Sequence, residues 1–216
     1  MTASNTDTPP EESTREKIKA AATEEFTQKG FDGARMQSIA DRAGANKAMI
    51  YYYFRSKDAL FEAVLRETFE ELFTRFAEIR PQGDPDPRIL IPQIVRLHFR
   101  FLADHPAIPK ILLREMHSHH PIVPKVLGEM FGKIKTERYP DFVRIFEAGV
   151  RAGKIRDVDP LQTILNILSM NIFYFIARPV LSVGWPDVFA SVSEEKLLEM
   201  REKAVSDLVL NGLLPR

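Results

Sequence analysis

Basic side chains are concentrated in one short stretch of a chain that is neutral as a whole. The chain has 216 residues, and its 30 Lys and Arg residues balance its 30 Asp and Glu residues. Residues 35–57 contain five basic residues and one acid, which leaves a local net charge of +4. A neutral chain does not hold nucleic acid or membrane by bulk charge, whereas a local basic patch can bind phosphate groups. The basic residues are Arg35, Arg42, Lys47, Arg55 and Lys57, and the acid is Asp41.

Side chains that can recognise DNA lie in the middle of this basic stretch. Asn46 and Lys47 are residue types that hydrogen-bond to base edges, and Ala48 lets the backbone approach closely. The hydroxyls of Tyr51, Tyr52 and Tyr53 can reach phosphate oxygens. A run of charge is also typical of an ordinary solvated face, so charge and spacing alone leave both interpretations open.

Lys57 adds a separate observation at the end of the stretch. It falls in the first turn of the next helical pattern, where a positive charge is unfavourable to the helix dipole. A phosphate bound beside Lys57 would remove this conflict.

A second group of reactive side chains lies at the end of a helical pattern in the middle of the chain. It consists of Glu115, His117, His119 and His120, to which His98 could add a ligand. His117 and His120 are three residues apart and can share a helix face, and histidine suits zinc or nickel. Histidines at a helix end also commonly cap carbonyls and face solvent. We therefore predict no metal site, and we keep a helical metal-dependent enzyme that uses these histidines as the alternative function.

Motifs for catalysis and for cofactors are missing from the sequence. It has no His-Glu-x-x-His motif, no nucleophile elbow and no phosphate-binding glycine loop. It also has no cysteine, which excludes disulfides, thiolate metal sites and cysteine nucleophiles. We predict a protein that is not an enzyme and has neither catalytic residues nor a cofactor. The lack of cysteine and of a signal-peptide pattern favours a cytoplasmic location.

Two short helical patterns would position the basic stretch. Residues 36–43 and 47–53 are separated by the tight segment Gly44-Ala45-Asn46. Two short helices joined by a glycine turn are typical of a helix-turn-helix, whose second helix enters the major groove of DNA. Similar helix pairs occur in many helical bundles. A helical adaptor that no longer binds DNA is thus a third possible function, and the local charge of +4 argues against it.

The whole chain is predicted to be all-α, with about nine helices. Ser13 and Ser56 are expected to cap two of them, and Gly30 is expected to end the first. Pro106, Pro121, Pro160 and Pro179 separate the later patterns, and Pro140 is expected to kink or split one of them. Beyond the basic stretch the predicted helices span 88–104, 106–118, 121–152, 160–177 and 193–211.

These patterns predict four regions. Residues 1–12 form a disordered arm, and 13–56 form a helix-turn-helix DNA-binding domain. A connecting helix spans 57–80, and residues 81–216 form a larger helical domain for effector binding and dimerisation.

The segment 161–177 is apolar on almost every side, and a helix of this kind needs apolar neighbours on every side. As a helix its residues would span about 25 Å, which is short of a bilayer core. We therefore expect no membrane partner. We predict that this helix and the last one, 194–210, pair with a second copy as a symmetric four-helix bundle. A helix buried within a single chain is the alternative.

Aromatic, methionine and polar residues of the middle helices are candidates to line a small-molecule pocket. Apolar residues at helical spacing belong to a core more often than to a cavity. His98 and Asn171 are more informative, because a buried polar group needs a partner that a ligand can supply. The candidate ligand-binding residues are His98, Phe101, Leu102, Met116, Phe142, Phe146, Asn171 and Tyr174.

The region around the basic stretch resembles the N-terminal domain of the TetR family of transcriptional regulators. The motif Ile39-Ala40-x-x-Ala43-Gly44 is followed, at the expected distance, by Tyr51-x-x-Phe54-x-Ser56-Lys57-x-x-Leu60. The similarity covers about residues 13–65. It implies an all-α homodimer whose N-terminal domains bind double-stranded operator DNA of palindromic sequence. It also implies a C-terminal domain that binds a small-molecule effector and thereby releases the DNA.

The resemblance also implies roles for single residues. Lys47 and Ala48 would face bases, and Tyr51, Tyr52 and Lys57 would contact phosphates. The packing that fixes the angle between the two helices would come from Ile39, Ala40, Ala43, Ile50 and Phe54. The full set of predicted DNA-binding residues is Arg35, Gln37, Ser38, Asn46, Lys47, Ala48, Tyr51, Tyr52 and Lys57.

Two residues depart from the family pattern. Most relatives have Thr or Ser where this chain has Arg35, which cannot cap a helix by accepting hydrogen bonds but could pair with phosphate. Ala45 replaces the usual valine of the turn. Neither departure weakens the resemblance to the family. The mechanism that the resemblance implies is that a ligand shifts the helix from Ser56 to Arg80 and alters the separation of the two DNA-binding domains.

Overall fold

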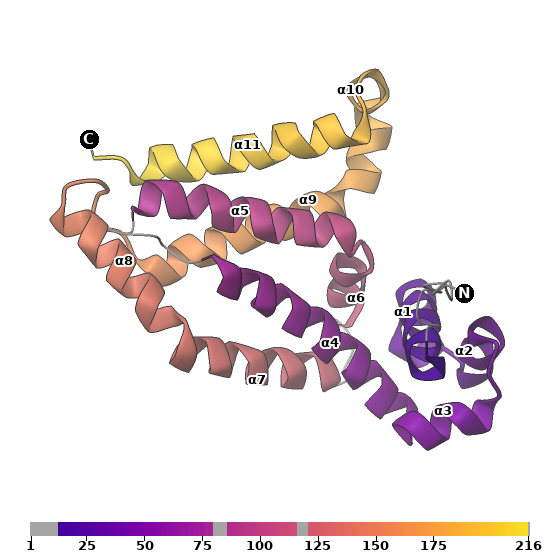
Figure 1. Ribbon diagram of the computed structural model, residues 1–216. Helices are drawn as coiled ribbons and strands as arrows, with labels where there is room; N and C mark the ends of the chain where they lie inside the picture. Colours follow the sequence, from indigo (N-terminus) through magenta and orange to yellow (C-terminus); the bar gives the residue numbers. More distant parts are fainter. Residues whose placement is uncertain (1–12, 80–85, 116–120, 216) are drawn as a thin grey trace, which may run out of the picture. The chain divides into compact units, whose positions relative to one another are not determined.

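The computed structural model describes residues 13–79, 86–115 and 121–215, and every regular element in these ranges is an α-helix (Figure 1). This confirms the predicted all-α class. The predicted number of about nine helices is wrong, because the described residues form eleven. They are α1 (Thr14–Gly33), α2 (Met36–Ala43), α3 (Lys47–Phe54), α4 (Lys57–Glu78), α5 (Pro87–Asp104), α6 (Ala107–Glu115), α7 (Ile122–Glu137), α8 (Tyr139–Arg151), α9 (Pro160–Gly184), α10 (Pro186–Ser191) and α11 (Glu194–Leu213).

The chain forms two compact units that divide inside α4. We call residues 1–64 the head and residues 65–216 the body. The head contains α1, α2, α3 and the first turns of α4, and the body contains the rest of α4 and α5 to α11. The domain boundary predicted from the sequence, between residues 56 and 57, stays a prediction.

An aromatic cluster forms the centre of the head. The ring of Phe61 lies 4.7 Å from that of Phe26 and 5.3 Å from that of Phe31, measured between centroids. The packing residues expected at the α2–α3 junction are buried, except Ala43, which is half-buried. The buried ones are Ile39, Ala40, Ile50 and Phe54.

Capping side chains begin the helices of the head as the sequence predicts. The Ser13 hydroxyl accepts a hydrogen bond from the Glu16 amide at 3.3 Å, and the Ser56 hydroxyl accepts one from the Ala59 amide at 3.0 Å. Each bond satisfies an amide that has no partner inside its own helix. Gly30, which was expected to end the first helix, instead forms a kink with φ of 70° three residues before α1 ends.

The body is built around α5, which packs against α9 and α11 (Figure 1). Apolar side chains from these helices and from α8 form one buried cluster. Its fully buried members include Ile91, Val95, Phe146, Ile167 and Val205.

Two of the prolines act differently on the predicted helices. Pro140 is the second residue of α8 and divides the segment 121–152 into α7 and α8, as expected. Pro179 lies inside α9, so the prediction that it separates two helices is wrong. Proline removes one helical hydrogen bond and often kinks a helix without ending it. Helix α9 therefore continues to Gly184, and α10 follows.

The greater length of α9 overturns the argument from the sequence that this helix is too short to cross a bilayer. With 25 residues, this helix is long enough and apolar enough to cross a membrane, judged by length and composition alone. Only 17% of its most apolar window is buried within the described part of the chain. Much of the apolar surface of α9 is thus left exposed or half-buried by the residues that the structure describes.

A buried polar pair connects α5 to α9. The Asn171 amide nitrogen donates to the Val95 carbonyl at 3.1 Å and lies 3.2 Å from Nδ1 of His98. Both side chains are almost completely buried. Burial lowers the pKa of His98 from its usual 6.5 to about 4, because the charged imidazolium loses its hydration. His98 is therefore neutral at pH 7.

Because His98 is buried in its neutral form, the protein should lose stability as the pH falls. Its pKa is higher in the unfolded chain than in the folded one, so between pH 6.5 and pH 4 the unfolded state binds an extra proton. We expect the free energy of unfolding to fall by about 1–2 kcal/mol between pH 7 and pH 5 because of this group. Urea titrations at the two pH values measure it. His98→Gln should remove that part of the decrease, while the control His105→Gln should keep it. An equal decrease in wild type and His98→Gln would contradict the prediction.

Candidate nucleic-acid interface

The helices α2 and α3 form a helix-turn-helix. Gly44 ends α2 in the left-handed conformation, with φ of 63°, which glycine adopts without strain. The Asn46 side-chain oxygen then accepts a hydrogen bond from the Met49 amide at 2.9 Å and so begins α3. Ile50 and Phe54 anchor α3 in the head core. The sequence Gly44-Ala45-Asn46 therefore stops one helix and starts the next at a fixed angle.

The side of α3 that does not face the head core is exposed. Lys47, Ala48, Tyr51 and Tyr52 are all on the surface, and the Tyr52 side chain is 81% exposed. The Lys47 ammonium lies 5.9 Å from the centre of the Tyr51 ring, close enough for a cation–π contact. The fold thus brings these four predicted DNA-binding residues together on one surface. Asn46 is exposed beside them, and its side-chain oxygen is already used in capping α3.

The start of α2 is capped by a residue from another helix. Arg35 makes no side-chain capping bond, as its chemistry requires. Instead, the buried carboxylate of Glu25 in α1 accepts a hydrogen bond from the Arg35 amide at 3.2 Å. The Arg35 side chain points into solvent-accessible space, where Gln37 is also exposed and Ser38 is half-buried. Glu25 is a functional residue that sequence analysis missed, although its polarity on an otherwise apolar face of α1 was the available signal.

Ion pairs attach the far end of α2 to α1. Arg42 pairs with Glu24 at 2.5 Å and with Glu25 at 3.6 Å. Both ends of α2 are therefore fixed by carboxylates of α1. Arg42 was predicted only as part of the basic stretch, and this contact gives it a structural role.

Lys57 has partners inside the head. Its ammonium donates to the Asp32 carbonyl at 3.1 Å and lies 4.7 Å from the centre of the Phe31 ring. These contacts give a structural reason for a positive charge at the start of α4, besides the phosphate contact predicted from the sequence. Arg55, which links α3 to α4, is exposed and has a φ of 62°, the only positive value among the described non-glycine residues.

The predicted ligand-binding residues that the structure describes all fall in the body, on α5, α8 and α9. The rings of Phe142 and Phe146 lie 4.5 Å apart between centroids, with their planes tilted by 41°, and pack with the cluster around Ile91. Tyr174 packs with Phe99 instead, at 5.4 Å. Phe101 and Leu102 are buried on α5, and Phe101 stacks on His105 at 4.3 Å. Met116 lies outside the described residues.

Three buried polar atoms near the His98–Asn171 pair have no hydrogen-bond partner among the described residues. They are Oδ1 of Asn171, the hydroxyl oxygen of Tyr174 and Nε of Arg201. The Arg201 guanidinium lies 5.9 Å from the centre of the Tyr174 ring, and its Nη2 donates to the Met170 carbonyl at 3.2 Å. Unpaired buried polar groups are costly, so this region of α5, α9 and α11 is the body's clearest polar site.

The histidine group is the basis of the alternative function. His117, His119 and His120 lie outside the described residues, and Glu115 is buried at the end of α6. No group of three or more potential ligands that could hold a metal ion occurs among the residues that the structure describes.

Comparisons with known proteins cover almost the whole chain. The family profile described as "Bacterial regulatory proteins, tetR family" matches residues 18–64. The profile described as "Tetracyclin repressor-like, C-terminal domain" matches residues 87–209.

Full-length relatives are similar along both units. The chain is 31% identical to the HTH-type transcriptional repressor NicS of Pseudomonas putida over 212 residues, covering 93% of this chain and 92% of NicS. It is 27% identical to the HTH-type transcriptional regulator RutR of Escherichia coli over 199 residues, covering 92% of this chain and 90% of RutR. The fold is similar to the crystal structure of the regulator FadR from Bacillus subtilis in complex with stearoyl-CoA. That match has a TM-score of 0.65 and 17% identity, and it covers 91% of this chain and 97% of FadR.

These matches favour a regulator, and nothing in them supports the alternative of a metal-dependent enzyme. The helix-turn-helix of the head, the helical body and both profile matches agree along the chain. The protein belongs to the TetR family and is a ligand-responsive, DNA-binding transcriptional regulator.

Proposed function

We propose that this protein is a cytoplasmic repressor that inserts α3 into the major groove of a palindromic operator. The observation that carries the proposal is the division of α3 into two sides. Ile50 and Phe54 hold the helix in the head core, while Lys47, Ala48 and Tyr52 are exposed. A helix fixed by its apolar side can present the other side to base edges.

The other predicted contacts have distinct roles in this proposal. Lys47 and Ala48 lie in the first turn of α3 and face bases, and Tyr51 and Tyr52 reach the backbone. The start of α2, with Arg35, Gln37 and Ser38, receives a phosphate. Because Glu25 supplies the cap of α2, the Arg35 side chain is left to approach that phosphate.

The uncovered apolar surface of α9 and α11 supports a homodimer. Exposed apolar residues recur along α9, and Met200 and Leu208 recur along α11. Those of α9 are Leu161, Leu165, Phe173, Val180 and Val183, and Trp185 continues the row just beyond the helix. Two such rows from each copy would form a four-helix bundle with two-fold symmetry. A bilayer is the less suitable cover, because Gln162, Asn166 and Ser169 are also exposed on α9.

The effector site in this proposal lies in the body. The unpaired atoms of Asn171 and Tyr174, next to neutral His98, would hydrogen-bond to a small molecule. The predicted aromatic residues on α5 and α8 would supply apolar contacts. The FadR structure with stearoyl-CoA supports a ligand-binding role for a body of this fold.

The proposed repression depends on a difference in affinity between two conformations. A ligand that prefers the conformation with poorly spaced heads weakens operator binding, and the operator must then weaken ligand binding equally. Helix α4 is continuous from Lys57 to Glu78 and extends through both units, so it is the element expected to move.

Lys47→Ala tests the base-reading role of α3. We expect operator affinity to fall about 10-fold to 100-fold, and discrimination against unrelated DNA to fall as well, because a base contact is lost. The operator is first obtained by selecting genomic fragments with the purified protein, and fluorescence anisotropy then gives both affinities. Arg151→Ala, at an exposed position at the end of α8, is the matched control and should leave both affinities unchanged. Unchanged discrimination in Lys47→Ala would argue against the role.

Lys57→Ala separates a phosphate contact from a purely structural lysine. If Lys57 binds phosphate, affinity for operator and for unrelated DNA should fall together. The slope of log affinity against log salt concentration should then decrease by about 1. If Lys57 only holds Asp32 and Phe31, the melting temperature should fall while the salt slope stays the same. Salt titrations and thermal melts of the same preparation distinguish these outcomes.

Phe173→Glu tests the dimer surface. Phe173 is 65% exposed on α9, and a carboxylate placed there would have to be desolvated in an apolar interface. We expect wild type to sediment at about twice the 24.7 kDa chain mass and Phe173→Glu to sediment as a monomer. Phe131→Glu is the matched control, since Phe131 is 51% exposed on α7, outside both rows. If Phe173→Glu stays dimeric, α9 is not the interface.

A further inference from the structure

An open groove on the body is lined by arginines from two helices. It lies between the end of α4 and the middle of α5 and has a volume of about 430 Å³. Arg75 and Glu78 come from α4, and Arg96 and Arg100 come from α5. The groove belongs to none of the sites described above, because the predicted effector residues of α5 are buried and those of the groove are exposed or half-buried.

The side chains that line the groove include more basic than acidic groups. Three guanidinium groups face one carboxylate, with Gln93 as a neutral polar neighbour. Each guanidinium is a planar fork of donors that matches a carboxylate or phosphate group, and it stays charged at every physiological pH. A volume of this size accommodates a molecule of metabolite size.

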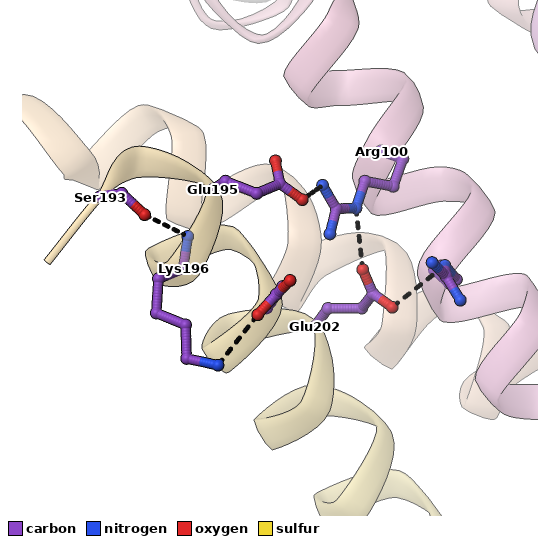
Figure 2. Close-up of polar contacts among 7 residues, drawn as sticks. Arg100, Ser193, Glu195, Lys196 and Glu202 are labelled. Atoms are coloured by element: carbon purple, nitrogen blue, oxygen red, sulfur yellow. Dashed lines mark hydrogen bonds and ion pairs between the residues drawn. The ribbon is translucent and has the colours of Figure 1, made fainter.

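The arginines are held in place by carboxylates that a ligand could replace. Arg100 donates through Nε to Glu202 at 2.9 Å and through Nη1 to Glu195 at 2.6 Å (Figure 2). The side chain of Glu195 is 63% exposed, and exposed ion pairs contribute little stability. Exchange of such a partner for the carboxylate of a ligand therefore costs little.

Arg96 is the least engaged of the three arginines. Its side chain is 68% exposed, and its single ionic contact among the described residues joins Nε to Glu202 at 3.4 Å. Arg75, by contrast, pairs with both Glu71 and Asp104. Arg96 can thus turn its outer nitrogens toward a ligand without breaking a close ion pair.

We propose that this groove is a second ligand site, which binds a small polyanion with at least two carboxylate or phosphate groups. One group is held by Arg96 and Arg100 on α5, and another by Arg75 on α4. The bound anion links α4 to α5 and competes with Glu195 and Glu202 of α11 for Arg100. Binding of the anion is inferred from the groove alone, whereas an effect of the anion on operator affinity rests on the proposed function.

Direct binding to the full chain, without DNA, tests the site. Isothermal titration calorimetry with citrate and with pyrophosphate, at fixed ionic strength, uses one carboxylate and one phosphate probe. We expect wild type to bind at least one probe with 1:1 stoichiometry per chain, and the preferred probe identifies the chemical source. Arg96→Gln should weaken this binding about 10-fold, because a charge-assisted hydrogen bond is lost. Arg144→Gln, with a 75% exposed side chain on α8, should bind as wild type does.

A second variant keeps every arginine and so avoids a loss of folding. Gln93→Glu adds a carboxylate to the exposed groove wall and should abolish binding, with the melting temperature close to that of wild type. The proposal is overturned if neither probe binds at millimolar concentration. It is also overturned if Arg96→Gln, Gln93→Glu and Arg144→Gln all bind as wild type does.

The two proposals fail separately. If wild type binds a probe but selects no operator, the groove stands and the repressor function fails. If wild type selects an operator but binds no probe, only the groove fails. If both proposals hold, fluorescence anisotropy with and without the bound probe measures how probe binding changes operator affinity. A change of two-fold or more in wild type that is absent in Gln93→Glu would link the groove to DNA binding.

Discussion

The geometry of the head depends on one buried carboxylate. Helix α2 begins at a residue whose side chain cannot accept a hydrogen bond, so its first amides need an acceptor from elsewhere. Glu25 of α1 supplies that acceptor to the Arg35 amide and also pairs with Arg42 at the other end of α2. Because α3 follows α2 after a short turn, this contact contributes to the orientation of α3, together with the buried Ile50 and Phe54. A residue of α1 thereby helps to position the exposed side of α3.

Local chemistry made much of this fold predictable. The caps at Ser13 and Ser56, the turn at Gly44 and the split at Pro140 each depend on a few neighbouring residues, and the structure contains all of them. The outcome at Pro179 depends on the whole of α9, which remains helical around the missing hydrogen bond, and the sequence could not reveal that. The partners of Lys57 and Arg35 could not be predicted either. They come from α1, more than nine residues away, and contacts of that kind require the tertiary fold.

The candidate sites differ in how far sequence could define them. Lys47, Ala48, Tyr51 and Tyr52 lie within six residues of one helix, so helical periodicity alone places them together. The described body residues come from three helices, and the structure places Phe142 and Phe146 in one apolar cluster and Tyr174 in another. The arginine groove was not predicted, because Arg75 and Arg96 are separated by a turn-rich linker and their charges are balanced by acids in the overall composition.

The position of the single tryptophan has a practical consequence. Trp185 lies at the junction of α9 and α10 and is 60% exposed. It continues the row of exposed apolar residues on α9. All indole fluorescence of the protein therefore originates from that one place. A shift of its emission to shorter wavelength would report the exclusion of water from the end of α9. The natural sequence thus carries its own optical probe of assembly, readable at concentrations too low for sedimentation and without any attached label.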